Sequence, residues 1–377
     1  PVMRLALGVL DKLSAGDGSG AVEDYARLFY ALRSAGSRSL GEWLDGRLRD
    51  RESPYAALVE RGGEDPALEA AARRDIETFT LLAELDWDQV LAEVGGKAPR
   101  EYGPVLANLP RWRGSSPFSF AELTELYRAN GAGLFARHRA FLWEDGALCP
   151  VEQPDCPGAD EMLGYELQRN RVIANTRAML EGNLVNNVLL YGDSGTGKSA
   201  TVKNLLTLPG FEALRLIEVQ KEGLADLPRL IRTLGGRRLK FILFIDDLAF
   251  DQDDKTYSAL KTILEGGLER RPANVAVYAT SNRRRLVRQT FSDRAGDEVD
   301  ASETIQEKTS LSDRFGLRIP YLALNQAEFL ELVEGMAEQA GIALDRDSLR
   351  AEAVKWEMRN PGRTPRTAKQ FIASLSL

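Results

Sequence analysis

The residues with the clearest chemical potential lie in the segment GDSGTGKS, which runs from Gly192 to Ser199. This segment matches the pattern G-x-x-x-x-G-K-[ST] in full, and an apolar run over 187–191 precedes it. Glycines let backbone N–H groups turn inward around phosphate oxygens, and the N-terminus of a helix beginning near Lys198 adds positive potential. A chance glycine-rich turn is the alternative, but a strand, the motif and a helix in succession favour a phosphate-binding loop.

The side chains of this loop have separate expected roles toward a nucleotide. Lys198 should reach the β and γ phosphates, and the Ser199 hydroxyl should be a ligand of Mg²⁺. The residues predicted to contact the nucleotide are Gly192, Asp193, Ser194, Gly195, Thr196, Gly197, Lys198, Ser199 and Ala200.

Two acidic residues, Asp246 and Asp247, follow a second apolar run over 241–245. Ligands bind at the carboxyl ends of strands in a parallel sheet. We therefore expect Asp246 to hold Mg²⁺, directly or through water, and Asp247 to orient or deprotonate the attacking water. An acidic turn that caps the next helix is the alternative. Many ATPases with such a phosphate loop carry Glu at the second acidic position. The side chain of Asp247 is one methylene shorter, which predicts either an adjusted position of the attacking water or slow hydrolysis.

The elements that must position these residues follow two patterns. Apolar residues at three- and four-residue spacing predict several short helices in residues 1–150. After them, β-branched or aromatic runs alternate with helical periods, which predicts a parallel sheet covered by helices. The expected strands are NNVLLY, LRLIEV, KFILFI, NVAVYA and LRIPYLAL. Three helical stretches close the chain, at 326–339, 346–358 and 365–375.

These patterns predict three domains. We expect an all-α N-terminal domain over 1–150, an α/β nucleotide-binding core over 151–322 and a small helical lid over 323–377. The segment from Trp143 to Met162 contains three prolines and both cysteines, so it is expected to link the first two domains.

Composition excludes several classes of site. The 377 residues carry 49 basic and 56 acidic side chains, a net charge of −7, and one histidine. With only His138, Cys149 and Cys156, neither a His-rich metal centre nor a disulfide framework is possible. His138 is expected to be structural or on the surface rather than catalytic. No apolar run approaches the roughly 18 residues that span a bilayer. We expect a cytoplasmic protein that does not enter a membrane.

Several further motifs resemble those of the AAA+ ATPases. The run NVAVYATSNRR resembles a strand ending in sensor 1, which implies that Asn282 contacts the γ-phosphate or the attacking water. SLSDRFGLRIPY resembles an arginine-finger segment, with Arg314 offered to a neighbouring subunit, and NPGRTPRTAKQFI resembles sensor 2, with Arg366 or, in its place, Arg363. A strand-end turn and surface or helix-start arginines are the alternatives.

The segment MLGYELQRNRV resembles the turn and helix that hold adenine in this superfamily, which places Leu163, Gly164 and Tyr165 beside the base; core packing is the alternative. The motifs taken together resemble a bacterial family described only as a domain of unknown function and predicted to be AAA+ ATPases. This resemblance covers most of 160–377 and residues 1–150 only loosely. It implies ATP or ADP with Mg²⁺ as ligand and a homo-oligomer, and it implies no particular substrate.

Three functions fit the sequence. The favoured one is an ATPase that hydrolyses ATP between subunits of an oligomer and remodels or loads a macromolecular partner, held through the N-terminal helices. The partner is expected to be a protein rather than DNA. The alternative is a nucleotide-dependent switch or scaffold with slow or no hydrolysis, motivated by Asp247. A P-loop kinase acting on a small molecule is disfavoured by the sensor and finger motifs.

A weaker feature leaves nucleic-acid contact open. Basic residues cluster just after sensor 1, at Arg283, Arg284, Arg285 and Arg288. A cluster of this kind neutralises phosphates, but a solvated helix face in an acidic chain explains it equally well. The polar segment 291–310 that follows has no clear periodicity and is expected to be a mobile loop.

Overall fold

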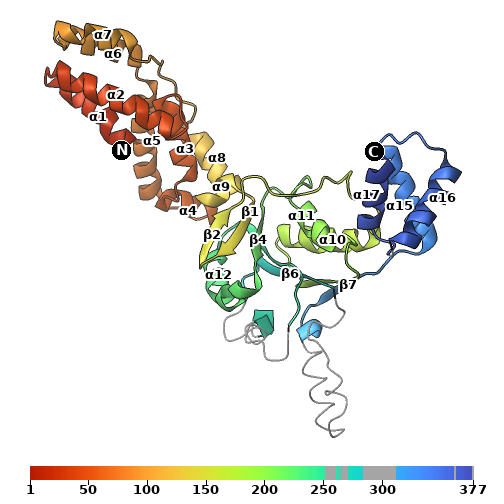
Figure 1. The fold of residues 1–377 in the computed structure, drawn as a ribbon. Helices are drawn as coiled ribbons and strands as arrows, with labels where there is room; N and C mark the ends of the chain where they lie inside the picture. The colour runs from red at the N-terminus through yellow and green to blue at the C-terminus, as the bar shows by residue number, and fades with distance from the viewer. Residues whose placement is uncertain (251–259, 262, 265–270, 283–310, 361, 376–377) are drawn as a thin grey trace. The chain divides into compact units, whose positions relative to one another are not determined.

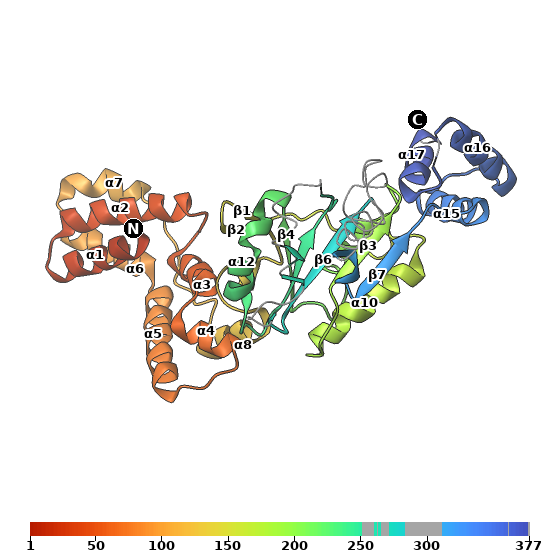
Figure 2. The ribbon, with the colours of Figure 1, turned by 90° about the horizontal axis from the view of Figure 1, so that it is seen from below.

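The computed structural model describes residues 1–250, 260–261, 263–264, 271–282, 311–360 and 362–375. The chain divides into two compact units, Pro1–Arg137 and His138–Leu377. We call them the N-terminal unit and the C-terminal unit. Figures 1 and 2 show their elements in two views.

The N-terminal unit consists of helices joined by turns and by one longer irregular segment over 109–119. Side-chain caps define where many of them begin, because a Ser or Asp oxygen accepts a hydrogen bond from a backbone N–H of the first turn. Ser39, for example, accepts from the Glu42 N–H, and Asp65 accepts from the N–H groups of Ala67 and Leu68. The helices are α1 (Val2–Ser14), α2 (Gly18–Ser34), α3 (Leu40–Asp50), α4 (Pro54–Glu60), α5 (Pro66–Glu84), α6 (Trp87–Lys97), the 3₁₀ turn η1 (Arg100–Tyr102), α7 (Gly103–Asn108), α8 (Phe120–Asn130) and α9 (Leu134–Arg137).

An aromatic cluster lies in the core of this unit. The Tyr25 ring stacks on Trp112 with 5.0 Å between ring centroids, and Trp87 lies 5.5 Å from Trp112. The Tyr25 hydroxyl donates to the Pro110 carbonyl at 2.9 Å, which satisfies its polar end inside the core. The N-terminal unit therefore has a hydrophobic core of its own.

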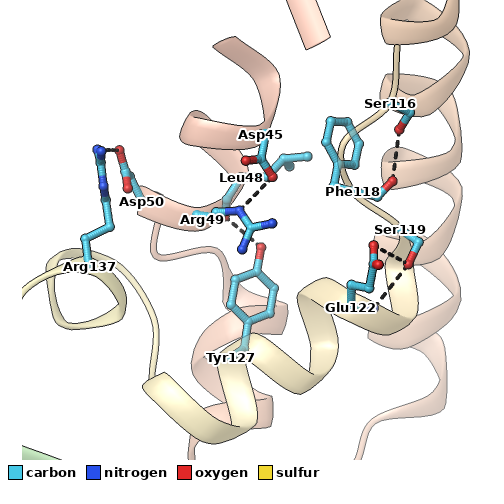
Figure 3. Close-up of polar contacts among 10 residues, drawn as sticks. All are labelled: Asp45, Leu48, Arg49, Asp50, Ser116, Phe118, Ser119, Glu122, Tyr127 and Arg137. Carbon is cyan, nitrogen blue, oxygen red and sulfur yellow. Dashed lines mark hydrogen bonds and ion pairs between the residues drawn. The ribbon is translucent and has the colours of Figure 1, made fainter. Parts of the chain in front are cut away.

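Polar contacts tie helix α3 to the last part of the N-terminal unit (Figure 3). The Tyr127 hydroxyl donates to the Leu48 carbonyl at 2.7 Å, and Arg137 pairs with Asp50 at 2.8 Å. Burial raises the pKa of Tyr127 to about 12, so its hydroxyl keeps its proton. These contacts join helices to one another.

The C-terminal unit is built on a seven-stranded sheet with the order β2-β1-β4-β5-β6-β3-β7. Strands β1 and β2 pair antiparallel, and the other pairs are parallel. All five strands expected from the sequence are present. The strands are β1 (Ala140–Glu144), β2 (Ala147–Pro150), β3 (Val188–Gly192), β4 (Leu214–Val219), β5 (Lys240–Ile245), β6 (Val275–Ser281) and β7 (Leu317–Tyr321).

Buried alternate residues of these strands form a core with two helices. Val172 of α10 (Glu166–Leu180) and Val202 of α11 (Lys198–Asn204) pack in one cluster with Leu190, Phe244 and other strand residues of the same face. The next residues along the same strands are buried too, as expected for a parallel sheet covered on both faces. The C-terminal unit also contains η2 (Lys221–Asp226) and α12 (Leu227–Leu234).

Helices α15 (Gln326–Gln339), α16 (Arg346–Arg359) and α17 (Pro365–Leu375) form a small lid with a separate cluster of buried residues (Figure 1). Asn325 and Glu328 form a capping box at the start of α15. The predicted α/β core followed by a helical lid, and preceded by an all-α region, is thereby confirmed. None of the helices in the described ranges combines the length and apolar composition needed to cross a bilayer.

The expected domain boundary near residue 150 differs from the structure. Strand β1 pairs with β4, and β1 and β2 form a hairpin, so residues expected to be helix or linker, including Trp143, belong to the sheet. The connecting residues Asp145 and Gly146 both have positive φ, 49° and 74°. An Asp-Gly pair between apolar strands is a strong hairpin signal, because such turns need positive φ at both positions. The boundary therefore lies between Arg137 and His138.

Candidate functional site

The glycine-rich loop leaves the sheet at the carboxyl end of β3, which lies between β6 and β7. Gly192 has φ 139°, and a Cβ there would lie 2.1 Å from the Tyr321 carbonyl oxygen, so only glycine fits. The Asp193 N–H donates to that same oxygen at 2.9 Å. Gly197 takes φ 89° directly before α11, whose first residue is Lys198. The loop is thus folded between a strand and a helix N-terminus.

Lys198 occupies the centre of the loop. Its Nζ donates to the carbonyls of Gly192 at 3.0 Å and Asp193 at 2.7 Å, and to Asn282 Oδ1 at 3.0 Å. Burial lowers the pKa of the Lys198 ammonium, and the Asp193, Asp247 and Asp246 carboxylates oppose that shift. A desolvated cation held among neutral oxygens is suited to a phosphate anion.

The two acids after β5 lie beside this lysine. The Ser199 hydroxyl donates to Asp246 Oδ1 at 2.6 Å, and the Asn282 amide donates to Asp247 Oδ1 at 2.8 Å. The structure thus brings together Lys198, Ser199, Asp246, Asp247 and Asn282, which the sequence places in three separate segments.

The oxygen atoms at this site suit a magnesium ion that the protein binds together with a nucleotide. Within the described ranges, no group of three or more His, Cys, Asp or Glu side chains could enclose a metal ion. Asp246 and Ser199 would supply one carboxylate and one hydroxyl, both hard oxygen ligands. Mg²⁺ commonly binds through one or two carboxylates together with phosphate oxygens and water, so the set fits Mg²⁺ carried in with a nucleotide.

Thr280 is part of this site and was not predicted from the sequence. Its hydroxyl donates to Asp246 Oδ1 and accepts the Asp247 N–H at 2.9 Å. Ala279 is the register partner of Ile245, so Thr280 comes level with the acids at the ends of neighbouring strands. A search for polar residues one or two positions before Asn282 would have found it.

A pocket of about 720 Å³ opens beside the loop. Loop residues 194–200 line it together with Asp246, Asp247, Thr280 and Asn282. Leu163, Gly164 and Tyr165, the residues predicted to lie beside adenine, also line it. This volume is within the range typical of small-molecule sites.

The turn at Gly164 and Tyr165 is held firmly. Tyr165 has φ 53°, its ring stacks on Tyr321 at 5.0 Å between centroids, and its hydroxyl donates to the Leu322 carbonyl at 2.6 Å. Arg169 donates to the Gly164 carbonyl at 2.7 Å. Burial raises the pKa of Tyr165, so this hydroxyl remains a donor.

The lid adds positive charge to the pocket. The Arg366 N–H donates to the Gly195 carbonyl at 3.2 Å, and its guanidinium donates to Ser194 Oγ at 3.3 Å. Lys369, which lies one turn later on α17, also lines the pocket and was not predicted. Arg363 instead pairs with Glu357 at 2.7 Å, which favours Arg366 as the pocket arginine.

Some predicted residues lie elsewhere. Arg314 does not line the pocket of this single chain; its backbone N–H donates to the Leu311 carbonyl at 3.2 Å. The basic residues Arg283, Arg284, Arg285 and Arg288 and the segment 291–310 fall outside the described residues.

Comparison with protein families identifies the C-terminal unit. The family model described as "Protein of unknown function (DUF815)" matches residues 136–376, which begin next to the unit boundary and contain every residue of the pocket. Because this match covers more than half of the chain, the protein belongs to that family. Comparison with curated proteins gave no match.

Comparison with solved structures gave matches to RuvB of Thermotoga maritima. One, described as a Holliday junction branch migration motor, has 17% sequence identity and a TM-score of 0.37, and the match covers 58% of this chain and 63% of that one. A single-substitution variant of the same protein has 17% identity and a TM-score of 0.39, with 58% and 63% covered. The chain thus spans less than two thirds of the length of these proteins.

Proposed function

We propose that this family member binds ATP with Mg²⁺ at the loop from Gly192 to Ser199 and hydrolyses it. The observation that carries the proposal is the convergence of the loop lysine, the loop serine, two strand-end acids and Asn282 in the lining of one pocket. Each is of the residue type that phosphoryl transfer needs, and catalysis of that transfer is mainly positioning and charge stabilisation.

Phosphate binding would rearrange contacts that already exist. The loop N–H groups would bond the phosphate oxygens, and Lys198 would exchange its carbonyl partners at Gly192 and Asp193 for the β and γ phosphates. Ser199 and Asp246 would hold Mg²⁺, which neutralises charge on the phosphate oxygens. Because the Lys198 ammonium is desolvated beforehand, exchange for an anion is favourable.

In the hydrolytic step, Asp247 and Asn282 would orient the attacking water and the Asp247 carboxylate would accept its proton. The Asn282 amide already bonds one oxygen of that carboxylate, which leaves the other for the water. Arg366, which reaches the loop from the lid, would stabilise charge that develops on the γ-phosphate. Leu163, Gly164 and Tyr165 would contact the adenine.

The proposal extends to an assembly. Arg314 lies away from the pocket of its own chain, as a residue that completes a neighbouring subunit's site would. We place hydrolysis between subunits of a homo-oligomer, and assign the N-terminal unit to a macromolecular partner, a protein, that the oligomer remodels or loads. The second candidate is a switch that binds ATP with little turnover. The observation that favours it is the Asp247 carboxylate, one methylene shorter than Glu and already bonded to Asn282.

Nucleotide binding is tested first, by titrating a fluorescent ATP analogue with and without Mg²⁺. Lys198→Ala should abolish measurable binding, because it removes the loop cation. Lys203→Ala removes a lysine from the same helix that does not line the pocket, so it should bind as the wild type does. Equal binding by wild type and Lys198→Ala would refute the site.

Assembly is tested by measuring ATP turnover per subunit against protein concentration, with mass determined by light scattering in the same samples. Turnover that rises as oligomers form, and is lost in Arg314→Ala, supports hydrolysis between subunits. Turnover independent of concentration and unchanged in Arg314→Ala refutes it. Binding with background turnover at every concentration supports the switch.

A further inference from the structure

We propose that Thr280 is a positioning residue. Its single hydroxyl group would fix Asp246, the acid proposed to hold the metal, relative to Asp247, the acid proposed to orient the attacking water. The inference rests on the proposed function and deepens it, because it concerns how the two acids are held. Thr280 would act through Asp246 and Asp247 and not through the nucleotide.

The hydroxyl of Thr280 uses both its donor and its acceptor capacity on these acids. Since it accepts the Asp247 N–H at 2.9 Å, its single proton is free to be donated to Asp246 Oδ1. The residue is 2% exposed, so bulk water has little access to replace either bond. Removing the hydroxyl would leave a backbone donor without its acceptor and a carboxylate oxygen with one donor fewer.

The backbone at Asp247 explains why such an anchor is needed. Its φ of 50° is in the left-handed region, which non-glycine residues adopt at an energetic cost and often at functional sites. The end of β6 supplies three contacts to this turn. They are the Thr280 hydroxyl to the Asp247 N–H, the Thr280 carbonyl to the Leu248 N–H at 2.7 Å, and the Asn282 amide to the Asp247 carboxylate.

Asp246 has a second reason to depend on Thr280. Its Oδ1 accepts from both Ser199 and Thr280. When the Ser199 hydroxyl turns toward a metal ion, Thr280 would remain to hold the carboxylate in place. The Asp246 carboxylate would then already have the orientation that binds the ion. Groups that hydrogen-bond to metal ligands usually have this orienting role.

The test compares Thr280→Val, which keeps the shape and removes the hydroxyl, with Thr280→Ser, which restores the hydroxyl. The control is Thr176→Val, because Thr176 is also buried and its hydroxyl bonds the Val172 carbonyl and Tyr278 outside the pocket. We expect Thr280→Val to lower kcat about 10- to 100-fold, the usual cost of losing a group behind a metal ligand. Thr280→Ser should recover most of the loss, and Thr176→Val should leave kcat within about twofold of wild type.

Two readouts do not depend on turnover. In EDTA, Thr280→Val should bind the fluorescent ATP analogue as wild type does, because the loop is intact, and it should lose part of the tightening that Mg²⁺ gives. Hydrogen exchange at the Asp247 amide should become faster in Thr280→Val and remain unchanged in Thr176→Val.

The outcomes separate this inference from the proposed function. Wild-type kcat and Mg²⁺ dependence in Thr280→Val would overturn the inference alone. A folded Thr280→Ser as impaired as Thr280→Val, or an equal loss in Thr176→Val, would also overturn it, because the hydroxyl would then not be the cause. If the wild-type protein bound no nucleotide, the proposed function would fall, and this inference with it.

Discussion

Two carboxylates of the C-terminal unit are each bonded by two side chains, with different consequences. Asp246 Oδ1 accepts from the hydroxyls of Ser199 and Thr280. In the lid, Glu334 Oε1 accepts from the guanidinium groups of Arg346 and Arg350. Both acids have their geometry fixed by two donors, and only one of them lines the pocket.

The difference lies in the charge of the donors. Hydrogen bonds from the two arginine cations lower the pKa of Glu334 to about 2. Because Glu334 lies on α15 and both arginines lie on α16, these ion pairs join the two helices. Neutral hydroxyls orient Asp246 and leave its negative charge available to a divalent cation. A carboxylate held by neutral donors at a pocket is therefore a better indicator of a functional site than one held by arginines, although both make the same number of bonds.

Replacing the acid proposed as base should reduce turnover more than any other change. Asp247→Asn keeps the shape of the side chain and removes its ability to accept a proton. ATP turnover should fall about 10²- to 10⁴-fold, the usual contribution of general base catalysis. ATP affinity should be retained, because the loop and Asp246 are untouched. Single-turnover hydrolysis and equilibrium binding on the same preparation measure both, and a variant that hydrolyses at the wild-type rate would remove Asp247 from the base role.

The comparison of the two carboxylates is tested by neutralising each in turn. Asp246→Asn should lower turnover about 100-fold or more, because a metal ligand should cost at least as much as a group behind one. Glu334→Gln should leave turnover within about twofold, since it removes only a contact between lid helices. Mg²⁺ titrations of both variants provide the measurement. A Glu334→Gln loss as large as that of Asp246→Asn would show that the charge of the donors does not distinguish the two acids.

A smaller effect separates the two lid arginines. Arg366→Ala should lower turnover about tenfold, as expected for one lost charge-assisted hydrogen bond to the γ-phosphate. Arg363→Ala breaks the ion pair with Glu357 and should affect lid stability only. Turnover and thermal unfolding measured for both variants decide between them. If Arg363→Ala had the larger effect on turnover, the assignment of the pocket arginine would be reversed.

The position of the glycine-rich loop between a strand and a helix, and of the two acids at a strand end, could be predicted because local rules are sufficient for them. A complete loop motif and acids directly after a buried strand need no knowledge of which strands are neighbours. Thr280 could be found from the sequence only as a candidate near Asn282, since its role depends on the register between β5 and β6. The hairpin at Asp145 and Gly146 carried a local turn signal, but it lay in a segment interpreted as linker.

The smallest effect concerns pH. The arginines lower the pKa of Glu334 from 4.5 to about 2, so this acid stabilises the folded state at pH values above about 4.5. That contribution is lost as pH falls from about 4.5 toward 2, when Glu334 becomes protonated in the unfolded and then the folded chain. Solvent screens both arginines, so we expect about 1 kcal/mol. The free energy of unfolding should therefore fall more steeply between pH 5 and pH 3 in the wild type than in Glu334→Gln, by about half of that amount, because the rest is lost below pH 3. Parallel urea denaturation curves at both pH values measure the difference. An equal pH-dependent change in the free energy of unfolding in both proteins would mean that the two arginines do not stabilise the lid through the charge of Glu334. The contrast with Asp246 would then depend only on which of the two acids lines the pocket.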